Sequence, residues 1–233
     1  MITTSLHDKR LPNESPQYRS ARDELLAEEQ ALRAQIERVA ELRRQLPQGG
    51  APKEDYEFEE IELTDGSMRP VRLSALFGDK TDLLVYSYMY GPEWEDPCPS
   101  CTSFIDCIDA VSRHVRRQAE IVVVGKATPE QLYKIAQERK WQDLRLLSCE
   151  KNYYARDYNA QPGDTSESLM PLMNAFQKDA DGIRHFWASE LLWTPMEGGH
   201  PRHIDIAWTV WGLLDMTRSG RHPKKTPQLR YQE

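Results

Sequence analysis

The feature that most constrains the fold is an alternation of apolar runs and helical patterns between residues 83 and 148. Nearly continuous apolar or aromatic runs cover 83–90, 121–125 and 144–148, as expected of strands covered on both faces. Helical patterns at about 100–118 and 128–140 separate them, and the second begins with a capping box, Thr128 to Gln131, with Pro129 at the first helical position. This order predicts a parallel βαβαβ unit with helices on the faces of the sheet.

Two hairpins are predicted on either side of this unit. Segments 56–63 and 71–73 flank the turn-forming residues 64–67, and segments 172–178 and 183–188 meet at 179–182. A last helix is predicted at about 205–217, with an apolar stripe of Ile206, Val210, Leu213 and Leu214. Trp208 and Trp211 lie three residues apart on it, a spacing that favours packing over ligand binding.

A long helix is predicted at 15–46, with Ser15 as N-cap and Pro16 at the first helical position. Apolar residues recur every seven positions, but Glu29 and Arg43 interrupt the second seam of a coiled coil. The helix therefore either packs along its own domain or forms a homodimer. We expect an N-terminal helical arm and linker at 1–52, an α/β domain at 53–220, and a loose, polar and basic tail at 221–233.

Composition excludes several functional classes. Thirty Lys and Arg against thirty-seven Asp and Glu give a net charge of −7, so no broad basic surface for nucleic acid is expected. No apolar run approaches the ~20 residues that span a bilayer, and the N-terminal segment does not resemble a signal peptide. We therefore expect a cytoplasmic protein, without a membrane partner or a cofactor. Four cysteines are too few for a secreted disulfide scaffold.

The main chemical motif is Cys98-Pro99-Ser100-Cys101, which follows a buried strand and opens a helix. A helix N-terminus carries a partial positive charge and free N–H groups, which stabilise a thiolate. Cys98 is therefore the candidate nucleophile, and Cys101 the residue that resolves a mixed disulfide. A Cys-x-x-Cys between a strand and a helix in a βαβ pattern indicates a thioredoxin-like redox site. The expected partner is a protein or small-molecule thiol or disulfide.

Three alternatives remain open for these thiols. They could bind zinc with His200 and His203, although that spacing is unlike common zinc folds, and our metal prediction is none. They could be purely structural, in a binding or assembly protein. Peroxide reduction is disfavoured, because such sites usually carry Ser or Thr three residues before the reactive cysteine, where this chain has Glu95.

A substrate groove is predicted from residues around the motif. Pro171 directly precedes the strand at 172–178, where a thioredoxin-like site would have a cis-proline facing the cysteines. We also assign Trp94 and Pro99 to this groove. Aromatic residues before the motif and at 153–158 could line a pocket beside the thiols. Asp96, if close to Cys98, would oppose thiolate formation.

The other two cysteines are predicted to be core residues. Cys107 falls with Phe104 and Val111 on the predicted apolar face of its helix, which also includes Ile108 and Val115. Cys149 ends a strand parallel to the strand before Cys98, so it lies at the same end of the sheet. A third redox thiol at Cys149 is the alternative.

The chain also resembles the thioredoxin-like family of domain of unknown function 899, often labelled a predicted dithiol-disulfide oxidoreductase. The resemblance rests on several segments spread over most of the chain: 14–23, 90–94, the cysteine motif, 154–158, 183–191 and 208–217. It implies a thioredoxin-like α/β fold, with helices on both faces of a mixed sheet and Cys98 and Cys101 as the redox pair. Thioredoxins usually carry Gly-Pro between their cysteines. Pro99-Ser100 here implies a different reduction potential, and the resemblance supplies no substrate.

Overall fold

The computed structural model describes residues 6–163, 168–194, 204, 206–222 and 224–231, in two compact units, Met1–Pro47 and Gln48–Glu233. The first unit contains α1 (Pro16–Arg44), which confirms the predicted long helix. The Ser15 hydroxyl accepts a hydrogen bond from the Tyr18 N–H at 3.1 Å, so Ser15 is the N-cap as predicted. Arg43 and Arg44 in the last turn complement the helix dipole.

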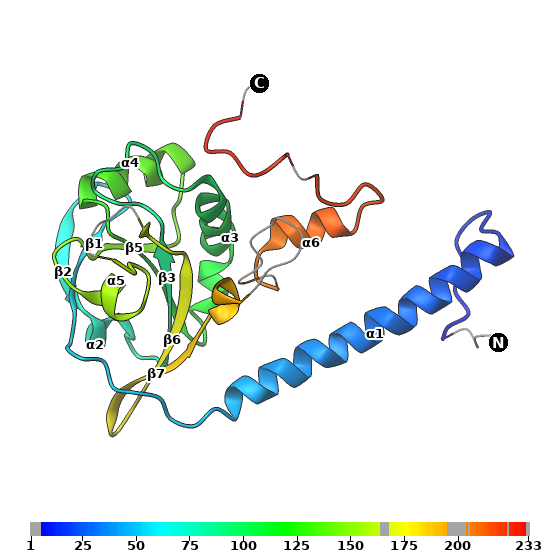
Figure 1. The fold of residues 1–233 in the computed structure, drawn as a ribbon, viewed down its shortest axis with the longest axis horizontal. Coiled ribbons are helices and arrows are strands. Elements are labelled where there is room, and N and C mark those ends of the chain that lie inside the picture. Colours follow the sequence, from blue (N-terminus) through cyan, green and yellow to red (C-terminus); the bar gives the residue numbers. More distant parts are fainter. Residues whose placement is uncertain (1–5, 164–167, 195–203, 205, 223, 232–233) are drawn as a thin grey trace. The chain divides into compact units, whose positions relative to one another are not determined.

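The second unit is built on a mixed seven-stranded sheet with the order β2-β1-β5-β4-β3-β6-β7 (Figure 1). Its strands are β1 (Glu57–Ile61), β2 (Met68–Arg72), β3 (Asp82–Tyr88), β4 (Glu120–Gly125), β5 (Arg145–Ser148), β6 (Leu172–Asp179) and β7 (Gly182–Ala188). Strands β3, β4 and β5 are parallel neighbours, which confirms the predicted βαβαβ unit. Strand β6 pairs antiparallel with β3, so β3 is an interior strand with β4 on one side and β6 on the other.

Both predicted hairpins are present. The turn between β1 and β2 contains Gly66 at φ 74°, and the turn between β6 and β7 contains Gly182 at φ 115°. Any other residue would be strained in these left-handed conformations. At Gly66 a Cβ atom would also lie 2.9 Å from the Tyr133 ring, so the turn requires glycine for space as well.

Helices cover both faces of the sheet, which confirms the predicted layered α/β architecture (Figure 1). On one face the core is formed with α3 (Pro99–Val115), α4 (Pro129–Arg139) and α6 (Thr209–Asp215). On the other it is formed with α2 (Leu73–Leu76) and α5 (Tyr154–Asp157). A short 3₁₀ helix, η2 (Glu190–Trp193), follows β7. Trp208 and Trp211 are buried and pack edge to face at 5.5 Å, as predicted.

Two predicted helical stripes are shifted in the structure. Val111 is 46% exposed and Cys107 only half-buried, because the buried stripe of α3 is centred on Cys101, Ile108 and Ser112. Helix α6 is also shorter than predicted, and Trp208 and Trp211 are the residues buried in the core there. Ile206 and Leu213 are therefore exposed, although Val210 and Leu214 do pack against the core. In α3 the buried positions include Thr102 and Ser112, which apolar periodicity alone does not select.

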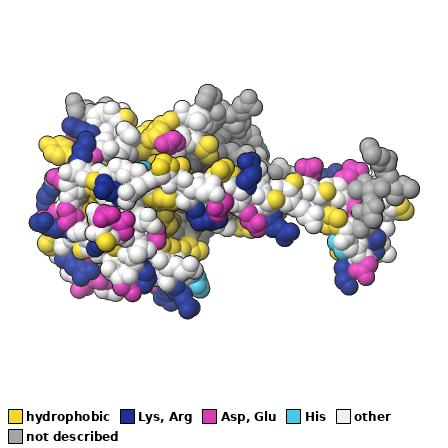
Figure 2. All heavy atoms as spheres, turned by 90° about the horizontal axis from the view of Figure 1, so that it is seen from below, with side chains coloured by type: hydrophobic (Ala, Val, Ile, Leu, Met, Phe, Trp, Pro, Cys, Tyr) yellow, Lys and Arg dark blue, Asp and Glu magenta, His cyan; other side chains and the backbone are white. Residues whose placement is uncertain are grey.

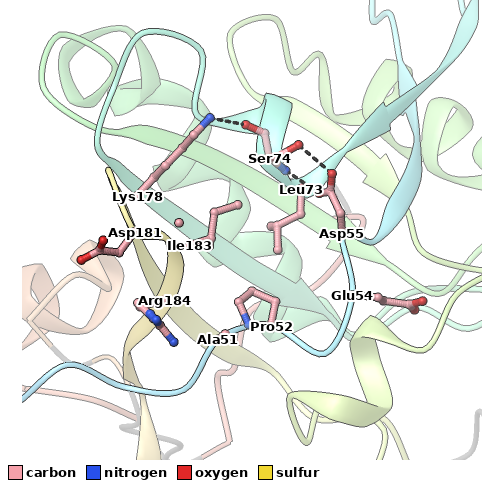
Figure 3. Close-up of a pocket in the computed structure, with 11 residues that line it drawn as sticks. Ala51, Pro52, Glu54, Asp55, Leu73, Ser74, Lys178, Asp181, Ile183 and Arg184 are labelled. Atoms are coloured by element: carbon pink, nitrogen blue, oxygen red, sulfur yellow. Dashed lines mark hydrogen bonds between the residues drawn. The ribbon is translucent and has the colours of Figure 1, made fainter.

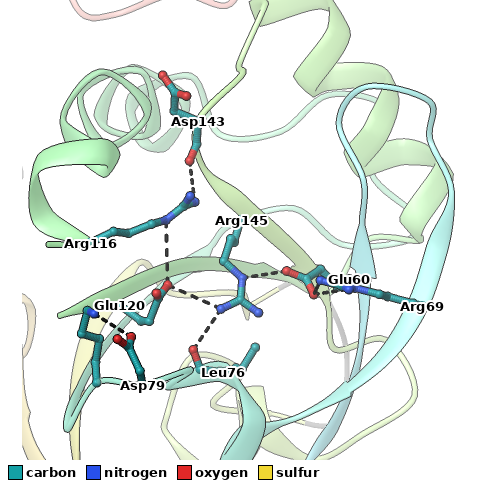
Figure 4. A network of polar contacts seen from close by, with 9 residues as sticks. Glu60, Arg69, Leu76, Asp79, Arg116, Glu120, Asp143 and Arg145 are labelled. Carbon is teal, nitrogen blue, oxygen red and sulfur yellow. Dashed lines mark hydrogen bonds and ion pairs between the residues drawn. The ribbon is translucent and has the colours of Figure 1, made fainter.

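A network of charged side chains joins β1, β4 and β5 (Figure 4). Arg145 donates to Glu60 at 2.7 Å and to the Leu76 carbonyl at 2.9 Å, and its guanidinium lies 3.5 Å from Glu120. Arg69 donates to the other oxygen of Glu60 at 2.9 Å. Burial raises the pKa of Glu60, but the hydrogen bonds and charges of these two arginines lower it more, so its net pKa is below the ordinary value.

No helix in the described part of the chain is long and apolar enough to cross a bilayer. On the face shown in Figure 2, basic and acidic side chains lie intermixed, without one broad basic area. Part of the polar tail is tied to the domain, because the Leu229 carbonyl accepts a hydrogen bond from Arg139 at 2.8 Å.

Candidate redox site

The cysteine motif follows the loop after β3 and opens helix α3. Cys98 is the N-cap of α3, and its sulfur accepts a hydrogen bond from the Cys101 backbone N–H at 3.4 Å. The Cys98 N–H donates to the Met89 carbonyl at 3.0 Å, just beyond the end of β3. Pro99 occupies the first helical position, where its missing N–H costs nothing. The sequence-predicted position of Cys98, at a helix N-terminus, is confirmed.

The two thiols have different environments. Cys98 is half-buried, whereas Cys101 lies in the core at 2% exposure, and both are free cysteines. A hydrogen bond from the Cys101 thiol and backbone hydrogen bonds from Cys101 and Ser100 lower the pKa of Cys98 to about 6, against the opposing effect of burial. Burial and the neighbouring Cys98 raise the pKa of Cys101 well above its ordinary value. Near neutral pH, Cys98 is therefore the thiolate and Cys101 the thiol that stabilises it.

Hydrogen bonds from neighbouring side chains connect the first turn of α3 to β3 and the loop before Cys98 to α4. The Thr102 hydroxyl donates to the Cys98 carbonyl at 2.9 Å and lies 2.6 Å from the Tyr88 hydroxyl. Gln131, in the capping box of α4, donates to the carbonyls of Pro92 and Trp94 at 3.0 and 3.3 Å. These contacts fix the loop that leads to Cys98. The contacts of Gln131 join residues that are 37 and 39 positions apart, so no local sequence pattern predicts them.

Pro171 lies at the predicted end of the sheet, near the cysteine loop, but the peptide bond before it is trans. Leu172 pairs with Ser87 near the end of β3, so the preceding Pro171 lies on the side from which the cysteine loop leaves the sheet. No described peptide bond is cis, and the bond before Pro171 is among those described. The expectation of a cis-proline is therefore wrong, and a substrate groove shaped by a cis-proline at this position is not supported. A role for buried Pro171 beside a substrate stays a prediction.

The remaining groove residues surround Cys98 in the chain. Pro99 is exposed, and Trp94 is half-buried against the core on the α3 side of the sheet. Asp96, which we expected to oppose the Cys98 thiolate, is paired instead with Arg230 at 3.2 Å. Arg230 lies in the tail predicted to be loose, and no local pattern predicts a pair between residues 134 positions apart.

The aromatic residues do not form the predicted pocket beside the thiols. Tyr86, Tyr88 and Tyr90 are all buried in the core on the α3 side. Tyr154 and Tyr158 pack on the opposite side of the sheet, where their rings lie 4.9 Å apart. The three tyrosines that precede the motif are two residues apart and therefore share one face of the sheet. Tyr154 and Tyr158 lie at α5, which covers the other face, so the two groups of rings are on opposite sides of the sheet.

Cys149 is buried in the core on the α2 and α5 side, whereas Cys101 belongs to the core of the other face. Burial raises the pKa of Cys149 to about 12, which keeps it a thiol. The prediction of a core role for Cys149 is confirmed. The half-buried Cys107 thiol donates to the Ser103 carbonyl at 3.4 Å within α3.

The alternative zinc site cannot be placed, because His200 and His203 lie outside the described residues. Within the described ranges, no group of three or more His, Cys, Asp or Glu side chains is arranged to hold a metal ion.

A pocket of about 400 Å³ lies at the other end of the sheet, by the β6–β7 turn (Figure 3). Lys178 reaches across it to the Ser74 carbonyl at 3.0 Å, and the Ser74 hydroxyl donates to Asp55 at 2.7 Å. The Lys178 backbone N–H donates a hydrogen bond to the Thr81 carbonyl, just before the start of β3. Cys98 follows the opposite end of that strand. This pocket is therefore separate from the cysteines.

In this sheet β3 lies between parallel β4 and antiparallel β6, and β7 pairs antiparallel with β6 at the edge. This strand order, with a cysteine pair after β3, defines a thioredoxin-like α/β protein. The chain belongs to the family described as "Bacterial protein of unknown function (DUF899)", whose model matches residues 9–233. This confirms the family resemblance. No curated protein matches the chain.

Solved structures of similar fold include peroxidoxin BcpB from Mycobacterium tuberculosis, at 20% identity and a TM-score of 0.46, covering 70% of this chain and 96% of that one. Thioredoxin peroxidase I from Plasmodium yoelii shows 17% identity and a TM-score of 0.46, covering 80% and 99%. The lipoprotein thioredoxin Etrx1 from Streptococcus pneumoniae shows 14% identity and a TM-score of 0.40, covering 66% and 98%. Such distant likeness says nothing about function, and the fold assignment here rests on the strand order.

Proposed function

We propose that the protein is a thiol-disulfide oxidoreductase in which Cys98 attacks and Cys101 resolves. The observation that carries this proposal is the asymmetry of the pair. Cys98 is a half-buried N-cap whose pKa is lowered to about 6, and Cys101 is a buried thiol one turn further along α3. A thiolate with a pKa near ambient pH combines a large ionised fraction with useful nucleophilicity.

The reaction proceeds in two exchanges. The Cys98 thiolate attacks one sulfur of a substrate disulfide, forms a mixed disulfide and releases the first substrate thiolate. Cys101 then loses its proton and attacks the Cys98 sulfur, which releases the second substrate thiolate. The substrate gains two electrons, and the protein is left with a Cys98–Cys101 disulfide. A thiol or dithiol reductant returns the pair to its starting state, and an excess of the reduced substrate, the dithiol product, drives the same steps in reverse.

The raised pKa of Cys101 has a role in this sequence. In the free protein it prevents a second thiolate from competing with Cys98. Once Cys98 is in a mixed disulfide, its negative charge is gone, and the charge repulsion that raises the pKa of Cys101 goes with it. The resolving thiol therefore becomes easier to ionise at the step that requires it.

Disulfide exchange with a small model disulfide and with a disulfide-bonded protein tests the proposal. Cys98→Ser is expected to abolish exchange, and Cys101→Ser to trap a mixed disulfide that mass spectrometry detects. Cys149→Ser is the matched control and should retain exchange, because that thiol is buried on the other face of the sheet. Equal exchange in wild type and Cys98→Ser would exclude this function and favour a binding or assembly role.

A further inference from the structure

The C-terminal segment 224–231 is bound to the domain beside the redox motif. It runs back from α6 toward α3 and α4 (Figure 1). The Arg230 guanidinium donates to Glu138 of α4 at 2.6 and 3.1 Å, and to Asp96 at 3.2 Å through two nitrogens. One guanidinium therefore bridges two carboxylates that come from different parts of the chain. Planar, two-pronged contacts of this kind are the strongest form of carboxylate recognition by a side chain.

A second arginine ties the same segment to the helices. Arg139 donates to the Leu229 carbonyl at 2.8 Å and to Asp106 of α3 at 3.2 Å. The Trp141 indole N–H donates to the same carboxylate at 2.8 Å. Residues 229 and 230 are therefore held by two adjacent residues of α4, at a point where α4 is itself linked to α3. This arrangement fixes Arg230 rather than leaving it on a free tail.

The bridge acts on the loop that positions the nucleophile. Asp96 lies two residues before Cys98, in the loop whose carbonyls at 92 and 94 bond Gln131 of α4. Because Asp96 and Glu138 contact the same guanidinium, removal of Arg230 would leave two negative charges close together. Their repulsion would push the loop away from α4 and work against the contacts of Gln131.

We propose that Arg230 is a positioning residue of the redox site, which holds the loop before Cys98 against α4 by neutralising Asp96 and Glu138 together. This inference rests on the proposed function, since it concerns the nucleophile of that reaction. The C-terminal segment thereby has a role: its Arg230 supplies the positive charge that the acidic loop before Cys98 lacks.

Amide hydrogen exchange of peptides covering residues 91–97 tests this role without any assay of activity. In Arg230→Ala we expect exchange in this loop to rise by about threefold to fivefold, as for loss of an exposed ion pair that holds a local structure. Arg230→Lys should give an intermediate rise, because an ammonium cannot bridge both carboxylates bidentately. Arg72→Ala, which removes an exposed arginine paired with Glu57 on the β1–β2 hairpin, is the control and should leave the loop unchanged.

The double variant Arg230→Ala/Glu138→Gln separates charge neutralisation from a mere tail contact. It removes the repulsion, so part of the loop protection lost in Arg230→Ala should return. The rate of disulfide exchange should fall by about threefold to fivefold in Arg230→Ala and recover in parallel. Unchanged loop exchange in Arg230→Ala, or an equal rise in the single and double variants, would overturn the proposal. If wild type performs no disulfide exchange, the proposed function fails while the hydrogen-exchange result still decides the role of Arg230.

Discussion

The Tyr88 hydroxyl and the Thr102 hydroxyl lie 2.6 Å apart in the core, and this contact joins the last residue of β3 to the first turn of α3. Because Thr102 also donates to the Cys98 carbonyl, the Tyr88 hydroxyl must be the donor to Thr102. The strand is thus connected to the backbone of the nucleophile through one threonine.

Tyr88→Phe is therefore expected to destabilise the protein by about 1 kcal/mol, because it removes one buried hydrogen bond and leaves Thr102 with an unused acceptor. Urea unfolding of the reduced protein measures this change. Thr102→Val in the Tyr88→Phe background should cost less than in wild type, since the two residues share the contact. Additive losses would mean that the contact is not formed.

The lowered pKa of Cys98 predicts its reactivity. The rate of alkylation of Cys98 by iodoacetamide, resolved by peptide mass spectrometry, should follow a titration with a midpoint near 6. Cys101→Ala should move this midpoint upward, because the Cys101 thiol is the largest single cause of the low pKa. Cys149 serves as an internal control and should stay unlabelled in the native protein. A Cys98 midpoint at an ordinary thiol value would contradict the assigned geometry.

The charged network around Glu60 predicts a stability effect and its pH dependence. Arg145→Ala should cost about 3 kcal/mol, because it leaves a buried carboxylate with only the exposed Arg69 as partner. Arg113→Ala, which breaks an exposed pair with Asp143, should cost less than about 1 kcal/mol.

The pKa of Glu60 is lower in the folded protein than in the unfolded chain, so ionised Glu60 stabilises the fold. This contribution is complete above the unfolded value of 4.5 and is lost as the pH falls through the lower folded pKa. Wild type and Glu60→Gln should therefore converge in free energy of unfolding at acid pH. A difference between them that is independent of pH would argue against an ionised Glu60.

The seven-residue repeat of α1 leaves a homodimer as a prediction for the first unit. Leu25→Asp together with Leu32→Asp should lower the mass measured by sedimentation velocity to that of a monomer, since charges in an apolar seam oppose pairing. Glu37→Gln on the same helix is the control. A monomeric wild type would exclude the dimer and favour the alternative, in which α1 packs along its own domain.

The short helices α2, α5 and η2 were not predicted. Local patterns were sufficient to predict the order of the seven strands and of α1, α3, α4 and α6, both glycine turns, the capping box of α4 and the position of Cys98. Each of these depends on residues within a few positions of one another. Local patterns could not show that β1 pairs with β5, that Glu60 is held by Arg145, or that Arg230 returns to Asp96. Those contacts depend on how distant segments meet. The exposed Val111 and the trans bond before Pro171 show the same limit, because tertiary packing decides both.

The most direct test of the central claim is a redox titration of the Cys98–Cys101 pair. Purified protein is equilibrated across a dithiothreitol or glutathione series, its free thiols are labelled, and intact and peptide masses are read with metal content assayed on the same sample. We expect one two-electron transition that involves Cys98 and Cys101 only, is absent in Cys98→Ser and is unchanged in Cys149→Ser. Two thiols that never pair at any potential, or that become accessible only when a chelator removes a bound metal, would contradict it.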